Sequence, residues 1–334
     1  MGKKEILIYN PHSNKEVTSY YIYIISSVFI EMGYSVKNIN LLCNCVDNYN
    51  KYIIIIDLKD VIEAKKYGFK NIIYWIQGVA PEEIYLKKKD ILRYLLYSYR
   101  EYKALRSSKF IFFCSENMKR HYEKKYKYYI DKYYIMPCFN EELHFDEILK
   151  KKYENNDFIY AGSLEKWQNF EETVSFYKKI EERVENVNFK VFVKDRIQAK
   201  KILEKYKIKN YVIDFVKPQE LTKEILQSKF GFCLRKNITV NLVATPTKLS
   251  NYIANGVLPI YSECLNGFYS QAKNSQYCIN ADDQDALQKI VELCNKKLDG
   301  IRVAEDFKKC FCNYYSAIFH REEIKKLFLK LGIN

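Results

Sequence analysis

The sequence lacks any apolar run of the roughly 18 to 20 residues that a membrane-spanning helix needs. Its first residues, Met-Gly-Lys-Lys-Glu-Ile, lead directly into a predicted strand and not into a signal peptide. Its ten cysteines include no Cys-x-x-Cys pair and its four histidines are scattered, which disfavours zinc sites and disulfides and indicates reduced thiols. We therefore expect a cytoplasmic protein without a metal site.

Acidic residues are fewer than basic ones: the chain has 41 aspartates and glutamates against 55 lysines and arginines, which gives a net charge of +14. Such an excess of positive charge indicates an anionic partner or an anionic surface. The basic residues are spread along the chain, with no long basic run and no helix-turn-helix, zinc-finger or single-strand-binding motif. Nucleic acid is therefore not the expected partner, although a basic nucleic-acid-binding protein stays an alternative hypothesis.

The densest basic patch lies in residues 87–106, where leucines and tyrosines recur at helical spacing. This pattern predicts one amphipathic helix with basic flanks. Two interpretations stay open. The helix packs its apolar side on the core and leaves a solvated basic face, or it attaches to anionic lipid head groups at the inner face of the cytoplasmic membrane.

Short apolar strands alternate with amphipathic helices along the chain, which predicts an α/β protein with doubly wound parallel sheets. The first series has predicted strands at 6–9, 35–39, 52–57, 71–76, 110–115 and 133–136, with helices such as 19–31 and 60–67. The second series has predicted strands at 158–161, 189–193, 211–215, 230–234 and 257–261, with helices at 170–182, 197–206, 221–227 and 247–254.

The two series predict two domains. The charged stretch 149–157 has no apolar period and predicts a linker. We expect Rossmann-like domains at 1–148 and 158–315 that face each other and bind ligands at the carboxyl ends of their strands. The remaining residues, 316–334, are expected to form a C-terminal helix that returns to the first domain.

The segment 231–260 carries the most specific pattern in the chain. A buried strand, a loop with Arg235 and a helix with Lys248 in its first turn follow one another, and a glycine ends the helix before a second buried strand. Thr245 is expected at the N-cap and Pro246 at the first helical position. Because a helix N-terminus offers free amides and a positive dipole end, the two cations beside it predict a phosphate or diphosphate site.

This segment closely resembles the donor-binding region of bacterial GT-B-fold glycosyltransferases, of the retaining, family-4-like kind that assembles capsule and lipopolysaccharide. Residues 160–169 look like the loop that opens the donor half, and residues 75–83 look like a cleft-facing loop of the acceptor half. The resemblance covers most of the chain in order. It implies a GT-B fold with an acceptor-binding first domain and a nucleotide-sugar-binding second domain.

The resemblance also implies roles for individual residues. Arg235 and Lys248 would stabilise the leaving diphosphate and are the expected catalytic residues. The expected donor-binding residues are Gly162, Ser163, Lys166, Val216, Lys217, Asn241, Pro246, Thr247 and Asn251. The acceptor side is expected to include Gln77, Gly78 and Glu82. Glu82 and its neighbour Glu83 could orient the acceptor, or they could only cap a helix after Pro81.

Several positions depart from the family pattern. Ser163 stands where many relatives have an arginine, so charge neutralisation would rest more on the nearby cations. The loop with Val216 and Lys217 would read a nucleobase through its backbone, and an ordinary strand-to-helix turn is the alternative. The two glutamates of the family's Glu-x7-Glu pair fall at Val243 and Asn251 here. Their absence keeps a second hypothesis open, a non-catalytic GT-B-like protein that only binds a nucleotide sugar.

The implied reaction moves a sugar from a nucleoside-diphosphate sugar to a glycan or lipid-linked acceptor in surface polysaccharide assembly, with retention at the anomeric carbon. No Asp-x-Asp motif follows a predicted strand, because the acidic cluster at 282–285 is better interpreted as charge at a helix start. We therefore expect a metal-independent transferase that needs no cofactor besides its donor substrate.

Overall fold

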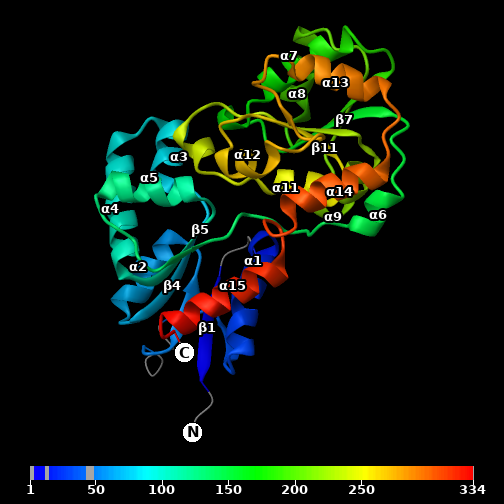
Figure 1. Ribbon diagram of the computed structural model, residues 1–334. Helices are drawn as coiled ribbons and strands as arrows, with labels where there is room; N and C mark the ends of the chain where they lie inside the picture. The colour runs from blue at the N-terminus through cyan, green and yellow to red at the C-terminus, as the bar shows by residue number, and fades with distance from the viewer. Residues whose placement is uncertain (1–3, 12–14, 43–48, 334) are drawn as a thin grey trace. The chain divides into compact units, whose positions relative to one another are not determined.

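The computed structural model describes residues 4–11, 15–42 and 49–333. The chain divides into two compact units: unit 1 comprises Met1–Asn140 and Ser316–Asn334, and unit 2 is Glu141–Tyr315. Each unit contains one six-stranded sheet whose neighbouring strands are all parallel (Figure 1). The predicted α/β class with two doubly wound parallel sheets is therefore confirmed.

Unit 1 has its strands in the order β2-β1-β3-β4-β5-β6. The strands are β1 (Glu5–Tyr9), β2 (Ser35–Ile39), β3 (Tyr52–Ile55), β4 (Asn71–Ile76), β5 (Ser108–Phe113) and β6 (Tyr133–Ile135). The helices are α1 (Lys15–Glu31), α2 (Leu58–Lys66), α3 (Ala80–Lys88), α4 (Ile91–Ser107), α5 (Glu116–Tyr126) and α15 (Ala317–Lys330). Strands β3 and β4 are nearly continuous buried apolar runs, as expected for parallel strands covered by helices on both faces.

The last helix, α15, packs on α1 within unit 1. The ring of Phe328 lies 5.2 Å from that of Phe29 and 5.0 Å from that of Phe110, measured between ring centroids. Lys325 forms an ion pair of 3.3 Å with Glu31 at the rim of this contact. A segment that follows unit 2 in the sequence therefore contributes to the core of unit 1.

Unit 2 has its strands in the order β12-β11-β10-β7-β8-β9. The strands are β7 (Asn156–Ala161), β8 (Val187–Phe192), β9 (Tyr211–Asp214), β10 (Phe230–Cys233), β11 (Leu258–Tyr261) and β12 (Ile279–Asn280). The helices are α6 (Phe145–Leu149), α7 (Phe170–Glu181), α8 (Arg196–Lys205), α9 (Pro218–Gln227), α10 (Thr239–Leu242), α11 (Thr247–Ala254), α12 (Asn266–Ala272), α13 (Ala286–Asn295) and α14 (Gly300–Phe311), with a 3-10 turn η2 (Lys166–Gln168).

Both sheets reverse their strand order at one point. In unit 1 the connection after β1 leads to β2 at one edge of the sheet, whereas β3 and the strands after it extend toward the other edge. In unit 2 the connection after β7 leads to β8 and β9 on one side, whereas β10 and the strands after it extend toward the other edge. Connections that leave two adjacent parallel strands in opposite directions open a crevice at the carboxyl ends of those strands. The strand order therefore places one candidate ligand site between β1 and β3 and another between β7 and β10.

The predicted linker at 149–157 is wrong, because these residues belong to unit 2 and are anchored there. Tyr153 is buried and its hydroxyl donates to the carbonyl of Gly256 at 2.7 Å. Lys151 Nζ donates to the carbonyl of Asn255 at 2.9 Å. Unit 2 begins at Glu141 and not at residue 158. A charged stretch without apolar periodicity is thus fixed by polar contacts that its own pattern does not reveal.

The single basic helix predicted for residues 87–106 is two helices in the structure. Lys89 ends α3 in the left-handed conformation with φ +54°, and the Asp90 carboxylate accepts from the backbone N–H of Arg93 to start α4. Residues 87–89 therefore belong to α3 and the turn after it. Helical spacing continues across this break, which is why the sequence pattern did not show it.

The segment 231–260 forms the predicted strand, helix and strand, with two differences. Helix α11 has the predicted bounds, and Gly256 follows its end with φ +64°, as expected for a helix-terminating glycine. Its N-cap is Pro246, one residue later than predicted, and no side chain caps it. The loop before it contains the short helix α10, which the sequence pattern did not predict.

No helix in the described part of the chain is long and apolar enough to cross a membrane. The eight described cysteines are free thiols. Cys43, Cys45 and His12 lie outside the described residues.

Close packing of α11 on β10 yields a stability prediction. A Cβ atom added at Gly231 would lie 2.5 Å from the ring of Tyr252, which is buried and held through its hydroxyl by the carbonyl of Phe232 at 3.3 Å. We expect Gly231→Ala to lower the free energy of unfolding by about 1–3 kcal/mol, the usual cost of overpacking. Denaturant unfolding measures this, with Gly231→Ala/Tyr252→Leu as the variant that relieves the clash. Additive effects of the two substitutions would contradict the assigned contact.

Candidate functional site

The candidate site of unit 2 lies where the loops after β7 and β10 diverge. The first loop begins at Gly162 and continues through the turn η2, and the second contains Arg235. Helix α11 follows the second loop and carries Lys248 as its second residue. The structure therefore brings the two predicted catalytic cations and the glycine loop to one end of the sheet.

Lys248 is the most unusual group of this site. Its Nζ atom is buried and has no hydrogen-bond partner among the described residues. It lies 4.1 Å from the ring centroid of Tyr160, a favourable position for a cation over an aromatic face. A Cβ atom added at Gly162 would lie 3.0 Å from this Nζ, so a glycine leaves the amine room beside the strand end.

The pKa of the Lys248 amine is lowered to about 7, first by burial and then by the nearby charge of Arg235. Burial without a partner disfavours the charged form of an amine, and a second cation disfavours it further. An anion placed between the two side chains would reverse both effects. The electrostatics of the site therefore suit a phosphate or diphosphate.

Arg235 is fixed from several sides. Its side chain is buried, and its Nη1 donates to the carbonyl of Gln168 at 3.2 Å. Its backbone N–H donates to Ser262 Oγ at 3.0 Å. The Oε1 atom of Gln168 is itself buried without a partner in the described structure. Gln168 was not predicted, and its position at the end of the loop that opens after β7 is the signal that would have found it.

Asn241 has a scaffold role in the structure. Its side chain is buried, and its amide group donates to the carbonyls of Trp167 at 3.1 Å and Lys236 at 2.9 Å. These bonds tie the loop after β10 to the turn η2. The amide hydrogens that were predicted to bind phosphate thus hold two loops together.

Four of the other predicted donor-side residues lie on the loop after β7 or on α11. Ser163 and Lys166 are exposed on that loop. Thr247 is the first residue of α11, and Asn251 lies one turn after Lys248, with its Oδ1 buried and without a partner in the described chain. Val216 and Lys217 follow the edge strand β9, so they share the carboxyl end of the sheet with the site but are separated from β7 by β8.

Unit 1 has a cavity of about 460 Å³ at its own point of strand reversal. Asn10 follows β1, Asp57 follows β3, and Gln77 and Gly78 follow β4 at its wall, so two of the predicted acceptor-side residues line it. The full lining is Asn10, Thr18, Ile56, Asp57, Leu58, Lys59, Tyr74, Ile76, Gln77, Gly78, Ala80, Glu83 and Tyr97. The wall combines amides, hydroxyls, two carboxylates and the amine of Lys59 with apolar side chains.

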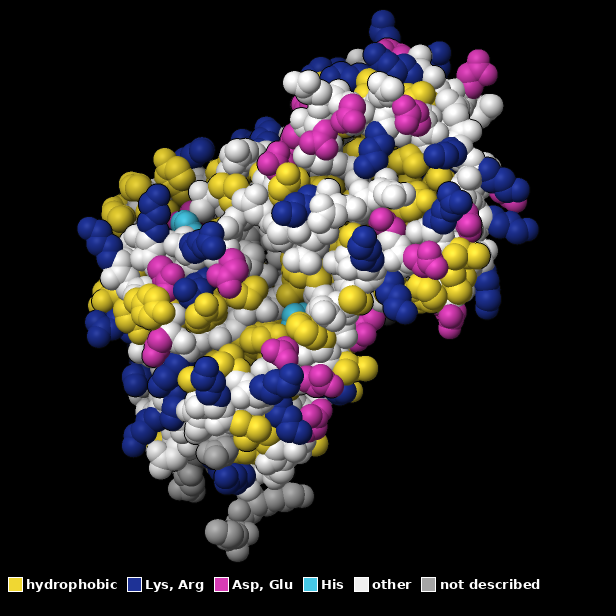
Figure 2. Space-filling model, in the orientation of Figure 1, with side chains coloured by type: hydrophobic (Ala, Val, Ile, Leu, Met, Phe, Trp, Pro, Cys, Tyr) yellow, Lys and Arg dark blue, Asp and Glu magenta, His cyan; other side chains and the backbone are white. Residues whose placement is uncertain are grey.

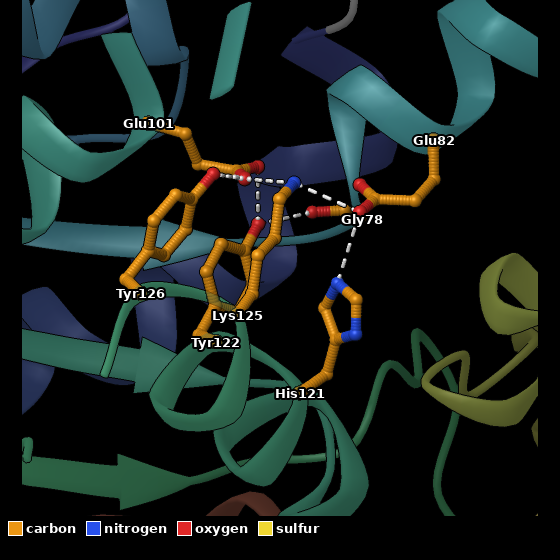
Figure 3. Close-up of polar contacts among 7 residues, drawn as sticks. All are labelled: Gly78, Glu82, Glu101, His121, Tyr122, Lys125 and Tyr126. Carbon is orange, nitrogen blue, oxygen red and sulfur yellow. Dashed lines mark hydrogen bonds and ion pairs between the residues drawn. The ribbon is translucent and has the colours of Figure 1, made fainter. Parts of the chain in front are cut away.

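The Gly78 loop is held by a polar network on α3, α4 and α5 (Figure 3). The Tyr122 hydroxyl lies 2.9 Å from the carbonyl oxygen of Gly78 and 2.7 Å from Glu101 Oε1, so these two acceptors share its single proton. Tyr126 and Lys125 also bind the Glu101 carboxylate. Burial raises the pKa of Glu101, and Lys125 and the two tyrosines partly offset that rise.

Glu82, predicted at the acceptor side, belongs to this network and not to the wall of the cavity. Burial alone would raise its pKa, but hydrogen bonds from His121 at 3.2 Å and Lys125 at 2.8 Å lower that pKa below its usual value. Its neighbour Glu83 lines the cavity instead, with a pKa raised by burial. One residue along a helix turns the side chain by about 100°, so sequence alone did not decide between the two acids.

Asn10 and Asp57 were also missed. Asn10 directly follows β1, and Asp57 lies two residues after the end of β3. A polar residue just beyond an inner strand, beside the reversal of strand order, is the signal that would have found them.

No group of three or more His, Cys, Asp or Glu side chains in the described residues is arranged to hold a metal ion. The cluster at 282–285 lies at a helix start, as expected, because Asp285 is the N-cap of α13. It also follows the short strand β12, which was not predicted. Its carboxylates have local partners: Asp282 accepts from the backbone N–H of Glu263 at 2.8 Å, and Asp283 accepts from the amide of Asn280 at 2.7 Å.

Known family models and curated protein sequences give no match to the chain. Solved structures do match. Sucrose-phosphate synthase from Thermosynechococcus elongatus is 9% identical, with a TM-score of 0.69, over 99% of this chain and 100% of that chain. The apo structure of OtsA is 10% identical, with a TM-score of 0.67, over 97% of this chain and 99% of that chain. The pneumococcal O-GlcNAc transferase GtfA, in complex with UDP and GlcNAc, is 11% identical, with a TM-score of 0.60, over 88% of this chain and 60% of that chain.

These structural neighbours are GT-B glycosyltransferases. The likeness shows that this chain has the GT-B fold, with a Rossmann-like sheet in each unit.

The buried amine of Lys248 yields a second prediction. A buried polar group without a partner costs about 1–3 kcal/mol, so Lys248→Met should raise the free energy of unfolding by this amount at neutral pH. The folded-state pKa is about 7 and the unfolded value is 10.5. The cost is therefore complete below pH 7, and it falls as the pH rises from 7 toward 10.5, where the unfolded state binds more protons.

Urea unfolding of both proteins at pH 6 to 10 tests this. The exposed Lys201→Met on α8 is the matched control and should show no pH-dependent difference from the native chain. A Lys248→Met variant that is less stable than the native chain at pH 6 would mean that Lys248 has a stabilising partner.

Proposed function

We propose that this protein is a glycosyltransferase that moves a sugar from a nucleoside-diphosphate sugar to a hydroxyl group of a glycan or lipid-linked acceptor in surface polysaccharide assembly. One observation carries the proposal. A buried lysine amine without a hydrogen-bond partner in the described part of the chain lies beside the Gly162 loop and near Arg235, at the point of strand reversal where ligands bind in this class of sheet.

The comparisons support a nucleoside-diphosphate sugar as the donor. GtfA was solved with UDP and GlcNAc, and a neighbouring E. coli trehalose-6-phosphate structure is bound with UDP-2-fluoro glucose. Another neighbour, trehalose-6-phosphate synthase, was studied for glycosyltransfer with retention. We infer a retaining reaction for this chain from that likeness and from the sequence resemblance.

In the proposed reaction the bond between the anomeric carbon and the β-phosphate oxygen breaks, and a bond from the acceptor oxygen to that carbon forms. The proton of the acceptor hydroxyl passes to the departing diphosphate. Negative charge then develops on the departing diphosphate. Lys248 and Arg235 are proposed to stabilise this charge, because fixed cations in a water-poor site are strongest where charge develops in the transition state. Gly162 gives the phosphates access to the backbone, and Asn251, one turn along α11, offers a side chain for a donor hydroxyl.

The acceptor is proposed to bind in the cavity of unit 1. Its wall offers amide and hydroxyl groups from Asn10, Thr18 and Gln77, together with the carboxylates of Asp57 and Glu83. Such groups bind the hydroxyls of a sugar. We propose that the enzyme acts in the cytoplasm on a nucleotide-sugar donor and needs no cofactor besides that donor.

Removing either cation should show its role. We expect Lys248→Ala and Arg235→Ala each to lower kcat/KM by on the order of 100-fold, since loss of such a stabilising group costs roughly 3 kcal/mol of transition-state stabilisation. Sugar transfer is measured with a panel of nucleoside-diphosphate sugars. The exposed Lys201→Ala on α8 is the matched control and should keep native turnover.

Two outcomes would contradict this. Native turnover in both variants would show that the diphosphate does not bind at this site. Tight binding of donors by the native chain, with neither transfer nor donor hydrolysis, would favour the non-catalytic nucleotide-sugar-binding protein.

Metal independence is a separate prediction. Because two side-chain cations are proposed to neutralise the diphosphate, turnover should stay within about twofold of its starting value in excess EDTA. Transfer assays with and without the chelator measure this. Loss of activity in EDTA that added Mn²⁺ or Mg²⁺ restores would show that a metal ion bridges the donor phosphates.

A further inference from the structure

Helix α4 leaves its apolar residues uncovered. Ile91, Leu92, Leu95, Leu96 and Tyr99 are 54%, 76%, 57%, 47% and 56% exposed, and their spacing places them on one side of the helix. We call these five residues the apolar strip of α4. The first of the two interpretations of this helix, an apolar side packed on the core, is therefore wrong.

The opposite side of α4 holds the helix on unit 1. Glu101, Ala104 and Leu105 are buried, and Glu101 accepts hydrogen bonds from Tyr122 and Tyr126 of α5. These contacts hold the helix from the side opposite the apolar strip. A row of large apolar side chains that lies outside the buried core indicates a surface that another body covers.

The charges around the apolar strip are almost all positive. Exposed cations precede and flank it at 87–89 on α3 and at Arg93, Lys103 and Arg106 on α4. Of the acids on or beside α4, Glu101 is buried on the opposite side, and Asp90 caps the helix and pairs with Arg93, so that it offsets one of these cations. Figure 2 shows hydrophobic and basic side chains intermingled at the edge of the molecule where α3 and α4 lie in Figure 1.

We propose that the apolar strip of α4 docks this protein on an anionic lipid bilayer. The helix would lie in the plane of the interface, with the strip among the acyl chains and the lysines and arginines at the phosphate level. Aliphatic residues with tyrosine on one side and basic residues beside them are the pattern of helices that bind this way. Each cation near an anionic surface adds to the attraction.

The positive charge around the apolar strip argues against a second copy of the chain as the partner that covers it. Self-association through this face in a two-fold dimer would bring the same patch of each copy together. The exposed cations at 87–89 and 93 would then lie near their own counterparts, where like charges oppose binding. An anionic bilayer meets both the apolar and the charged part of the surface.

Vesicle flotation of the full chain tests the proposal and does not depend on the proposed enzyme activity. The probes are phosphatidylcholine vesicles with and without phosphatidylglycerol, each at low and high salt. We expect binding to the anionic vesicles only, and weaker binding at high salt because exposed charges are then screened.

Two variants separate the contributions. Changing Lys87, Lys88 and Lys89 to Gln should lower partitioning about 100-fold, since about 1 kcal/mol per charge corresponds to about fivefold each. Changing Leu92, Leu95 and Leu96 to Ser should lower it at least about tenfold even at low salt. The matched control on α8, with Ile197→Ser, Lys200→Gln and Lys201→Gln, removes exposed apolar and basic groups elsewhere and should bind as the native chain does.

Several results would overturn the proposal. These are equal binding of the native chain to both vesicle types, no binding to either, and unchanged binding of either α4 variant. A native chain that is dimeric in light scattering, and monomeric with the three leucines changed, would assign the face to self-association. Thermal unfolding checks that the variants fold, and a stabilisation of all variants by a nucleoside diphosphate reports on unit 2 separately. Failure of that stabilisation would count against the proposed function and leave the docking result standing.

Discussion

A lysine amine that is removed from water, without a hydrogen-bond partner among the described residues, is the constraint on which the carboxyl end of unit 2 depends. A side chain at Gly162 would crowd this amine, because its Cβ would lie 3.0 Å from Lys248 Nζ, and Tyr160 offers its ring face where a carboxylate would have neutralised the charge. Asn241 joins the two loops that form the walls. Each of these features keeps a positive potential available to a ligand at the cost of stability in the empty protein.

The two units treat charge in opposite ways. In unit 1, Lys125, His121 and two tyrosines bind the carboxylates of Glu82 and Glu101, although Glu82 Oε2 is buried without a partner among the described residues. In unit 2 the buried Lys248 amine has no hydrogen-bond partner in the described part of the chain. Carboxylates that are bound by cations do not require a charged ligand, whereas an unpaired buried cation favours an anion. This contrast agrees with the proposed assignment of acceptor and donor to different units.

The sequence was most informative where one burial pattern decides the structure. Parallel strands such as β4 are apolar runs with sharp ends, and α11 lies between a proline and a glycine, so their bounds were predicted. The sequence was least informative where the same helical spacing fits both a covered and an exposed side of a helix. It placed Leu92 and Leu95 on one side of a helix without showing whether that side is covered. It also did not separate Glu82 from Glu83, or show that Asn241 binds carbonyl groups, because those facts depend on neighbours distant in sequence.

The two sides of helix α4 have different roles. Glu101 faces inward and is linked to the Gly78 carbonyl through the hydroxyl of Tyr122, whereas the residues of the apolar strip are largely exposed and take no part in this network. A single substitution in the strip would therefore alter the proposed docking surface and leave the network intact. A substitution of Glu101 would instead disturb the loop that lines the cavity of unit 1.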